Sequence, residues 1–235
     1  METNSFFNYA PAFNTKSVRK AFTEKVFTLC ASQLLMTTLI VCAILSNSFL
    51  LQIASVLNIP CALGGIVLII ALGCSKNLAR QVPTNYVLLG LFTLFESITL
   101  GYYLSFFDIA IVGQASVVTA CIVFATFLAA KSSKFDMTNT KFFGYMALFH
   151  LVLLVLSLFF FRLNHIFFAY LGAIMYTAYL ILDIQLIMGN KDKKLSVDDY
   201  VMGSIMVYMD IINLLIKIVQ ILDSMKDDKD KKKKR

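Results

Sequence analysis

The stretches AYLILDIQLIMG (residues 178–189) and MVYMDIINLLIKIVQIL (residues 206–222) decide how this chain folds, because each places an aspartate inside an otherwise apolar run. The aspartates are Asp183 and Asp210. A carboxylate costs about 2.5–3.5 kcal/mol at the centre of a membrane helix, so a purely structural span would avoid one. The two aspartates are therefore the first candidates for functional residues.

The composition around these stretches is that of an integral membrane protein. Hydrophobic residues make up 59% of the 235 residues and the mean hydropathy is +0.77, whereas soluble domains contain about 45–50% apolar residues. Seven apolar runs approach or exceed the length that crosses a ~30 Å hydrocarbon core. They lie at Val26–Ser46, Ile59–Cys74, Tyr86–Leu104, Ile109–Ala130, Phe142–Phe161, Ile166–Met188 and Val201–Leu222. The sequence predicts an all-α membrane protein with three parts: an N-terminal tail (1–25), a seven-helix membrane domain (26–222) and a basic C-terminal tail (223–235).

The distribution of basic residues predicts the orientation. Twelve lysines and arginines lie in the N-terminal tail and in the 2–3, 4–5 and 6–7 loops, whereas the other loops contain only Arg162. Because basic loops stay in the cytosol, we expect a cytosolic N-terminus. The last span conflicts with this rule, since a full crossing would place the basic C-terminal tail on the opposite side. Either that segment is re-entrant, or a helix shielded by protein overrides the charge rule.

Polar residues in the last two spans fall on one face of each helix. The residues at spacings of three or four are Asp210, Asn213 and Lys217 in the last span, and Gly172, Tyr176, Tyr179 and Asp183 in the span before it. These spacings stack side chains along one side of a helix. A lipid-facing helix would not carry such a stripe. We therefore expect the last span to be buried in the bundle, with the two polar stripes sharing one cavity.

Two carboxylates in one low-dielectric cavity do not both ionise readily, so the pair should titrate as a unit. A shared proton, a basic side chain or a hard cation would relieve the repulsion between the two carboxylates. Calcium takes about six to eight oxygen ligands, and the two aspartates supply only part of that shell. The other candidate oxygens belong to Tyr176, Tyr179, Asn213 and backbone carbonyls. We expect a weak, transient calcium site and no tightly bound cofactor; the alternative is a carboxyl pair that only fixes the helix register.

Three further positions carry charges with two interpretations each. Glu96 lies inside the third span and either lines a pathway or braces one helix on another. Asp198, beside Asp199, either interacts with the N-terminus of the last helix or forms a mouth that concentrates cations. Arg80 is either an interfacial anchor or a partner for the aspartates.

Several functional classes are disfavoured. The chain contains no Ser-His-Asp arrangement, H-E-x-x-H motif or Walker lysine, and both histidines are isolated, so we expect no enzyme. The net charge of +7 lies in loops and tails rather than on a basic face, which argues against nucleic-acid binding. The five cysteines show no C-x-x-C spacing, which argues against a zinc site.

Several segments together resemble the transmembrane Bax-inhibitor-motif family, in particular its Lifeguard branch, which includes Golgi anti-apoptotic proteins. The likeness covers nearly the whole chain. Its segments are FNYAPAF (7–13), RKAFTEKVFTLCASQLLMTT (19–38), VPTNYVLLGLFTLFESITLG (82–101), YLILDIQLIMG (179–189) and SVDDYVMGSIMVYMDIINLLIKIVQIL (196–222). The resemblance implies six helices around a central, polar seventh.

The resemblance also implies a calcium leak from intracellular stores, with protonation as the switch. Asp183 and Asp210 match the family's gating pair, and Arg80 matches an arginine that latches the closed state in a bacterial relative. Asp198 matches an acidic position implicated in ion passage, where glutamate is usual, and Glu96 also matches the branch.

We therefore expect a pH-sensitive, calcium-permeable leak channel of endoplasmic reticulum or Golgi membranes that suppresses cell death. Its partners would be calcium ions, protons and the lipid bilayer. In this hypothesis Arg80 pairs with Asp183 when the channel is closed. The alternatives are a non-conducting scaffold for other membrane proteins and a cation/proton antiporter; the sequence shows no internal repeat of the transporter kind.

Overall fold

A computed structural model describes residues 16–132, 165–189 and 195–233, together with residues 145, 148 and 152. Within this part of the chain all seven regular elements are helices, and six are long and apolar enough to cross a membrane. They are α1 (Lys16–Ser46), α2 (Ser48–Cys74), the short α3 (Lys76–Arg80), α4 (Thr84–Leu104), α5 (Ile109–Ser132), α7 (His165–Met188) and α8 (Tyr200–Lys233). The predicted all-α membrane fold is confirmed. The predicted span at Phe142–Phe161 lies outside the described residues apart from three isolated positions.

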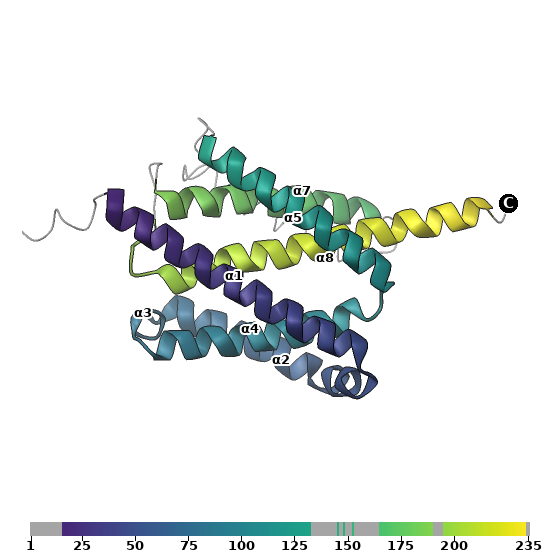
Figure 1. The fold of residues 1–235 in the computed structure, drawn as a ribbon, viewed down its shortest axis with the longest axis horizontal. Coiled ribbons are helices and arrows are strands. Elements are labelled where there is room, and N and C mark those ends of the chain that lie inside the picture. Colours follow the sequence, from purple (N-terminus) through teal and green to yellow (C-terminus); the bar gives the residue numbers. More distant parts are fainter. Residues whose placement is uncertain are drawn as a thin grey trace, which may run out of the picture.

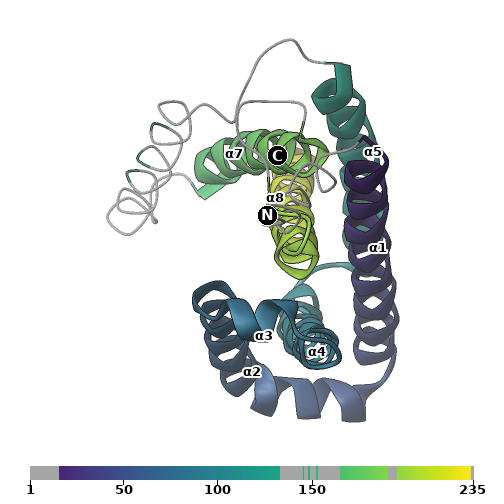
Figure 2. The ribbon, with the colours of Figure 1, turned by 90° about the vertical axis from the view of Figure 1, so that its left-hand side faces the viewer.

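Helix α8 occupies the centre of the bundle. Seen end-on, it lies between α7, the α1–α5 side and the α2–α4 pair (Figure 2), and the first view shows it running the length of the molecule (Figure 1). Val201, Ser204, Val207 and Asp210 are buried, and at about 100° per residue they point in four directions about 60° apart around the helix axis. A helix buried on several faces must be surrounded by protein. The expected central polar helix is therefore confirmed.

Helix α2 shows the opposite pattern, which is typical of a lipid-facing helix. Its buried residues form a single narrow stripe, Ala54, Cys61, Gly65 and Leu72. The large apolar side chains on its other faces are exposed, with Val56 at 75%. Helix α2 also changes direction along its length (Figure 2), as expected for a helix that contains an internal proline, here Pro60.

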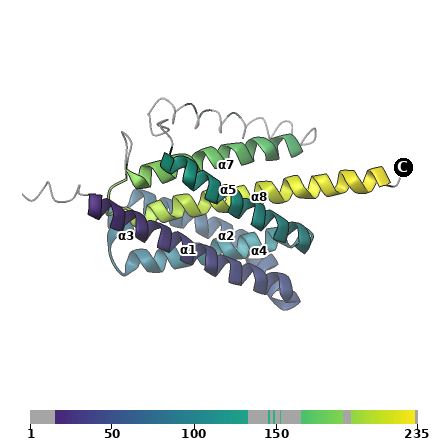
Figure 3. The ribbon, with the colours of Figure 1, turned by 45° about the horizontal axis from the view of Figure 1, so that its top comes forward.

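Ion pairs distinguish the two ends of the bundle. At one end, the Arg80 end, the side chain of Arg80 pairs with Asp199 just before α8 begins. At the other, the Asp108 end, Lys226 of α8 pairs with Asp108 in the α4–α5 connection. A third view shows α8 as one continuous helix between these ends (Figure 3). Of the two options for the last span, this unbroken helix surrounded by its neighbours agrees with the shielded helix rather than with a re-entrant segment.

Two helices begin before the apolar runs that predicted them, and α8 continues past its run to Lys233. Helix α1 begins ten residues before Val26. Its first turns carry charges, but they pack on the bundle. Phe22 is 4% exposed, and the guanidinium of Arg19 donates to the Ile187 carbonyl at the end of α7. Helix α2 begins at Ser48 rather than Ile59. Side-chain packing and capping extend both helices beyond their most hydrophobic windows.

Candidate functional site

The candidate site lies between α7 and α8, where the two polar stripes face each other. Near one end of the stripes, Asp183 of α7 meets Asp210 of α8. Further along, Gly172 of α7 lies under the side chain of Lys217, so that a Cβ at position 172 would be 2.9 Å from the lysine Cε. The i, i+3 and i, i+4 spacings place the polar residues of each stripe on one face of its helix. A single antiparallel contact between α7 and α8 therefore brings the two stripes together. The structure therefore pairs the two stripes as the sequence indicated.

The two aspartates form a buried carboxyl pair. Asp183 is 7% exposed and Asp210 is 9% exposed, and their side chains are hydrogen-bonded to each other. Carboxylates only accept hydrogen bonds, so a bond between two carboxyl groups requires one shared proton. The Oδ2 atom of Asp210 is buried and has no hydrogen-bond partner in the described part of the chain. The geometry thus allows the two carboxyl groups to share a proton, and Oδ2 of Asp210 is an acceptor without a partner among the described residues.

Two tyrosines of α7 complete the surroundings of the pair. Tyr176 lies within electrostatic reach of Asp210, and Tyr179 lies within reach of both aspartates. Both rings are half-buried. Their hydroxyl oxygens are neutral and can donate to a carboxylate or accept from a donor. The site therefore combines two acidic groups with neutral oxygens, and the described residues contain no cluster of three or more His, Cys, Asp or Glu side chains.

The rest of the α8 stripe is engaged in hydrogen bonds. Asn213 donates to the Met209 carbonyl of its own helix at 2.8 Å. The ammonium of Lys217 donates to Oε1 of Gln220 at 3.3 Å, and Gln220 donates to the hydroxyl of Tyr103 on α4 at 2.8 Å. Lys217 is half-buried, and its bonded ammonium group is held within the bundle. This chain of bonds ties α8 to α4 on the Asp108 side of the carboxyl pair.

Arg80 does not make the expected pairing with Asp183. Its Nε donates to Oδ1 of Asp199 at 2.8 Å and its Nη2 donates to Oδ2 at 3.1 Å. The Asp199 carboxylate and, more weakly, the charge of Asp198 hold the pKa of Arg80 above its usual value. Arg80 ends α3, and Asp199 directly precedes Tyr200, where α8 begins, so this fold places Arg80 beside the start of α8 rather than beside the pair. The link joins α3 to the N-terminal end of the central helix.

The remaining predicted residues lie apart from the carboxyl pair. Asp198 is exposed at the Arg80 end, and its amide donates to Ser196 Oγ at 3.5 Å. Glu96 points from α4 towards α2, so that a Cβ at Gly65 would lie 3.0 Å from its Oε1. The packing therefore does not bring Glu96 to the α7–α8 interface.

The sequence interpretation missed a second buried polar cluster, on the α1–α4 side of α8. Gln33 Nε2 donates to Thr93 Oγ1 at 3.1 Å, and Ser97 Oγ donates to Thr37 Oγ1 at 2.9 Å. The Thr37 hydroxyl is also bonded to the hydroxyl of Tyr208 at 2.9 Å. The spacing held a signal: Gln33 and Thr37, like Thr93 and Ser97, are separated by four residues within apolar runs. The cluster cross-links α1, α4 and α8.

Comparison with known proteins gives consistent matches over most of the chain. A family model described as "Inhibitor of apoptosis-promoting Bax1" matches residues 19–228. The chain is 29% identical to Protein lifeguard 3 of Homo sapiens, covering 89% of this chain and 70% of that protein. It is 31% identical to Bax inhibitor 1 of Schizosaccharomyces pombe, covering 91% and 80%. It is also 31% identical to the Golgi anti-apoptotic protein of Vaccinia virus (strain Lister), covering 92% of each.

Proposed function

The chain belongs to the Bax-inhibitor family, and on this premise we propose that it suppresses cell death by a pH-controlled leak of calcium through the α7–α8 site. The names of its relatives support a membrane anti-apoptotic role. The name of the viral relative supports a Golgi or endoplasmic reticulum location. The distribution of basic residues supports a cytosolic N-terminus.

The observation that carries the proposal is the hydrogen-bonded pair of buried carboxyl groups, Asp183 and Asp210, on two membrane-length helices. Each carboxylate would cost about 2.5–3.5 kcal/mol at the centre of a membrane helix. A pair that only joined two helices would be replaced at lower cost by apolar residues. Acidic groups retained at this depth are the ones that proton and cation pathways use.

In the proposed mechanism the shared proton decides whether a cation can bind. With the proton in place, the pair carries one negative charge and its facing oxygens are occupied by the hydrogen bond. Loss of the proton leaves two carboxylates, which repel each other until a divalent cation lies between them. Tyr176 and Tyr179 add neutral oxygens, so the shell is incomplete and calcium passes rather than stays. Acidification therefore closes the site.

The ion pair between Arg80 and Asp199 restrains the central helix in this mechanism. It holds the N-terminal end of α8 against α3, so a movement of α8 that parts the carboxyl groups has to break it or carry it along. Asp198 beside it is exposed and attracts cations to this end of the bundle. Arg80 thus acts as a latch through Asp199.

The test is calcium flux from liposomes that contain the purified protein, scanned from about pH 6 to 8, where a shared carboxyl proton is able to titrate. The expected result is a flux that falls on acidification in the wild type, and a flux without pH dependence in Asp183→Asn and Asp210→Asn. Glu96→Gln is the matched control, because it also removes an intramembrane carboxyl group but lies away from the pair. Its flux should keep the wild-type pH profile.

Two results would overturn the proposal. Unchanged pH dependence in both aspartate variants would remove the pair from the mechanism. Wild-type protein that is folded but gives no flux above empty liposomes would favour the scaffold, whose function should depend on its tails. Proton flow in fixed ratio to calcium, recorded with a pH-sensitive dye inside the liposomes, would instead identify a cation/proton antiporter.

A further inference from the structure

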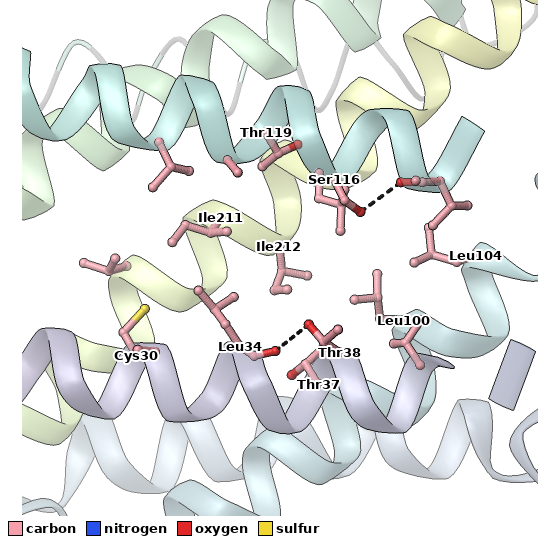
Figure 4. A pocket seen from close by; sticks show the side chains of 18 of the residues that line it. Cys30, Leu34, Thr37, Thr38, Leu100, Leu104, Ser116, Thr119, Ile211 and Ile212 are labelled. Atoms are coloured by element: carbon pink, nitrogen blue, oxygen red, sulfur yellow. Dashed lines mark hydrogen bonds between the residues drawn. The ribbon is translucent and has the colours of Figure 1, made fainter. Parts of the chain in front are cut away.

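A second feature, independent of the carboxyl pair, is an apolar cavity of about 900 Å³ between α1 and α5, with α8 as its floor (Figure 4). The volume is at the upper end of the range of about 300–1,000 Å³ that is typical of ligand sites. Leu34 and Val41 of α1, Phe124 of α5 and Ile211 of α8 are among its apolar walls. No charged side chain of the described residues lines it.

The cavity exists because α1 and α5 carry small residues where they face each other. Gly113, Ser116 and Ala120 recur at spacings of three and four on α5, and Ala31 and Thr38 lie on the facing side of α1. All five are exposed, so the cavity reaches the surface of the bundle between the two helices. Large apolar side chains of the same two helices, such as Leu35 and Val117, are also exposed.

The cavity is long and closed at one end. Its lining runs from Phe27 to Ser46 on α1, which is about 29 Å at 1.5 Å per residue. The rings of Phe27 and Phe127, in edge-to-face contact at 5.5 Å, close it towards the Arg80 end. The cavity is therefore open at its side and closed at one end. A transmembrane helix of a partner would have to pass this closed end, whereas a hydrocarbon chain that enters from the side can end there.

Water is an unsuitable occupant for the same cavity. The hydroxyl groups of Thr38 and Ser116 already donate to carbonyls of their own helices at 2.8 Å. Among the hydroxyls that line the described part of the cavity, only that of Thr119 lacks a partner. A buried water needs two to four polar partners, and one free hydroxyl does not supply them.

We propose that this cavity is a binding site for one acyl chain of a membrane glycerophospholipid, which enters sideways between α1 and α5. The lateral opening, the apolar walls and the closed end are those that a chain from the surrounding bilayer requires. Ile184 and Ile211 line the cavity and directly follow Asp183 and Asp210 in sequence. A bound chain would therefore touch the helices that hold the carboxyl pair, and any effect on calcium flux rests on the function proposed above.

The test is photolabelling of the full-length protein in vesicles of phosphatidylcholine with a diazirine in one acyl chain, followed by peptide mapping. Lipids that merely surround the protein label outward residues such as Val56 of α2, which is 75% exposed. A chain in the cavity also labels the central helix α8 at Ile211 and Leu215, which line the floor. We expect label on both α2 and α8.

Glycine variants provide the matched comparison. A Cβ at Gly113 or at Gly90 meets nothing within 4 Å, but only Gly113 lines the cavity. Gly113→Phe should reduce the α8 label at least fivefold while the α2 label is unchanged, and Gly90→Phe should leave both unchanged. Ala120→Phe, at a second exposed lining position, serves if Gly113→Phe does not give a monodisperse protein.

Three outcomes would overturn the proposal. Label confined to α2 in the wild type would show surrounding lipid only. Label on α8 that survives the variants blocking the cavity would show that the chain reaches α8 by another route. Label on α8 from a photoreactive sterol or free fatty acid but not from phosphatidylcholine would assign the cavity to a different lipid. None of these readouts depends on calcium flux, so this proposal and the proposed function fail independently.

Discussion

The ion pair between Arg80 and Asp199 makes the sharpest prediction, because the structure puts Asp199 where the resemblance had suggested Asp183. The contact is bidentate, with N···O distances of 2.8 and 3.1 Å. At close contact and an effective dielectric constant of 20, two unit charges would interact by about 4 kcal/mol. The side chains are 34% and 24% exposed, however, and pairs open to solvent contribute only about 0.2–1 kcal/mol.

We therefore expect a coupling energy between Arg80 and Asp199 of about 0.5–1 kcal/mol, near the top of that range because the geometry is bidentate. Since 1.4 kcal/mol is a factor of ten, the pair changes an equilibrium about two- to fivefold. The measurement is a double-mutant cycle of Arg80→Ala and Asp199→Ala, read as the free energy of unfolding and as calcium flux. A parallel cycle pairs Arg80→Ala with Asp183→Asn and should show additive effects.

Asp198 requires a control in this experiment, because its charge also acts on Arg80. In Asp199→Ala the arginine is free to turn to Asp198, which would reduce the measured coupling. The cycle is therefore repeated in an Asp198→Asn background, where the coupling to Asp199 should be equal or larger. A coupling to Asp199 below about 0.3 kcal/mol, together with a larger coupling to Asp183, would refute the assignment of the latch.

Three further predictions concern the packing of α8. Tyr208→Phe removes a buried bond to an α1 hydroxyl and should lower the free energy of unfolding by about 0.6–1.7 kcal/mol, the range for interhelical hydrogen bonds in membranes. Gly172→Val forces methyl groups into the Lys217 side chain and should destabilise the protein by about 1–3 kcal/mol, measured by denaturant titration in micelles. Lys226 donates to Asp108 and so lowers the pKa of that carboxyl group. The Asp108 carboxylate therefore stabilises the fold at any pH above its unfolded pKa of about 3.9. This stabilisation is lost as the pH falls through the lower pKa of the folded state. The melting temperature of Asp108→Asn should therefore lie below that of wild type near neutral pH and match it at about pH 2.

Matched variants give the controls for these three. Tyr170→Phe changes the same atom on an exposed ring and should have little effect on stability. Gly73→Val adds the same atoms where a Cβ meets nothing within 4 Å. Glu24→Gln removes a carboxylate from an exposed pair with Lys20, which should leave the melting temperature unchanged at every pH. If a control variant changes stability as much as its test variant, the corresponding contact is not responsible.

Parts of the fold and of the candidate site were predictable because they depend on local patterns. Hydropathy and length predicted the spans that α4, α5 and α7 confirm to within a few residues. The three- and four-residue spacings predicted that Asp183 and Asp210 would face each other. A four-residue spacing also relates Gln33 to Thr37 and Thr93 to Ser97. Two hydroxyl or amide groups four residues apart do not reveal, however, which helix they will contact.

By itself, the sequence determined that this is a membrane bundle with a buried polar helix, because hydrophobic content and helical periodicity are properties of single segments. The tertiary structure alone decided that Arg80 meets Asp199 rather than Asp183, that Glu96 turns towards α2, and that α8 crosses the whole bundle. It also decided that the small residues of α1 and α5 leave a cavity between them. The physical reason is that each of these depends on how separate helices rotate and shift against one another, and packing between helices sets that geometry, not the pattern within any one of them.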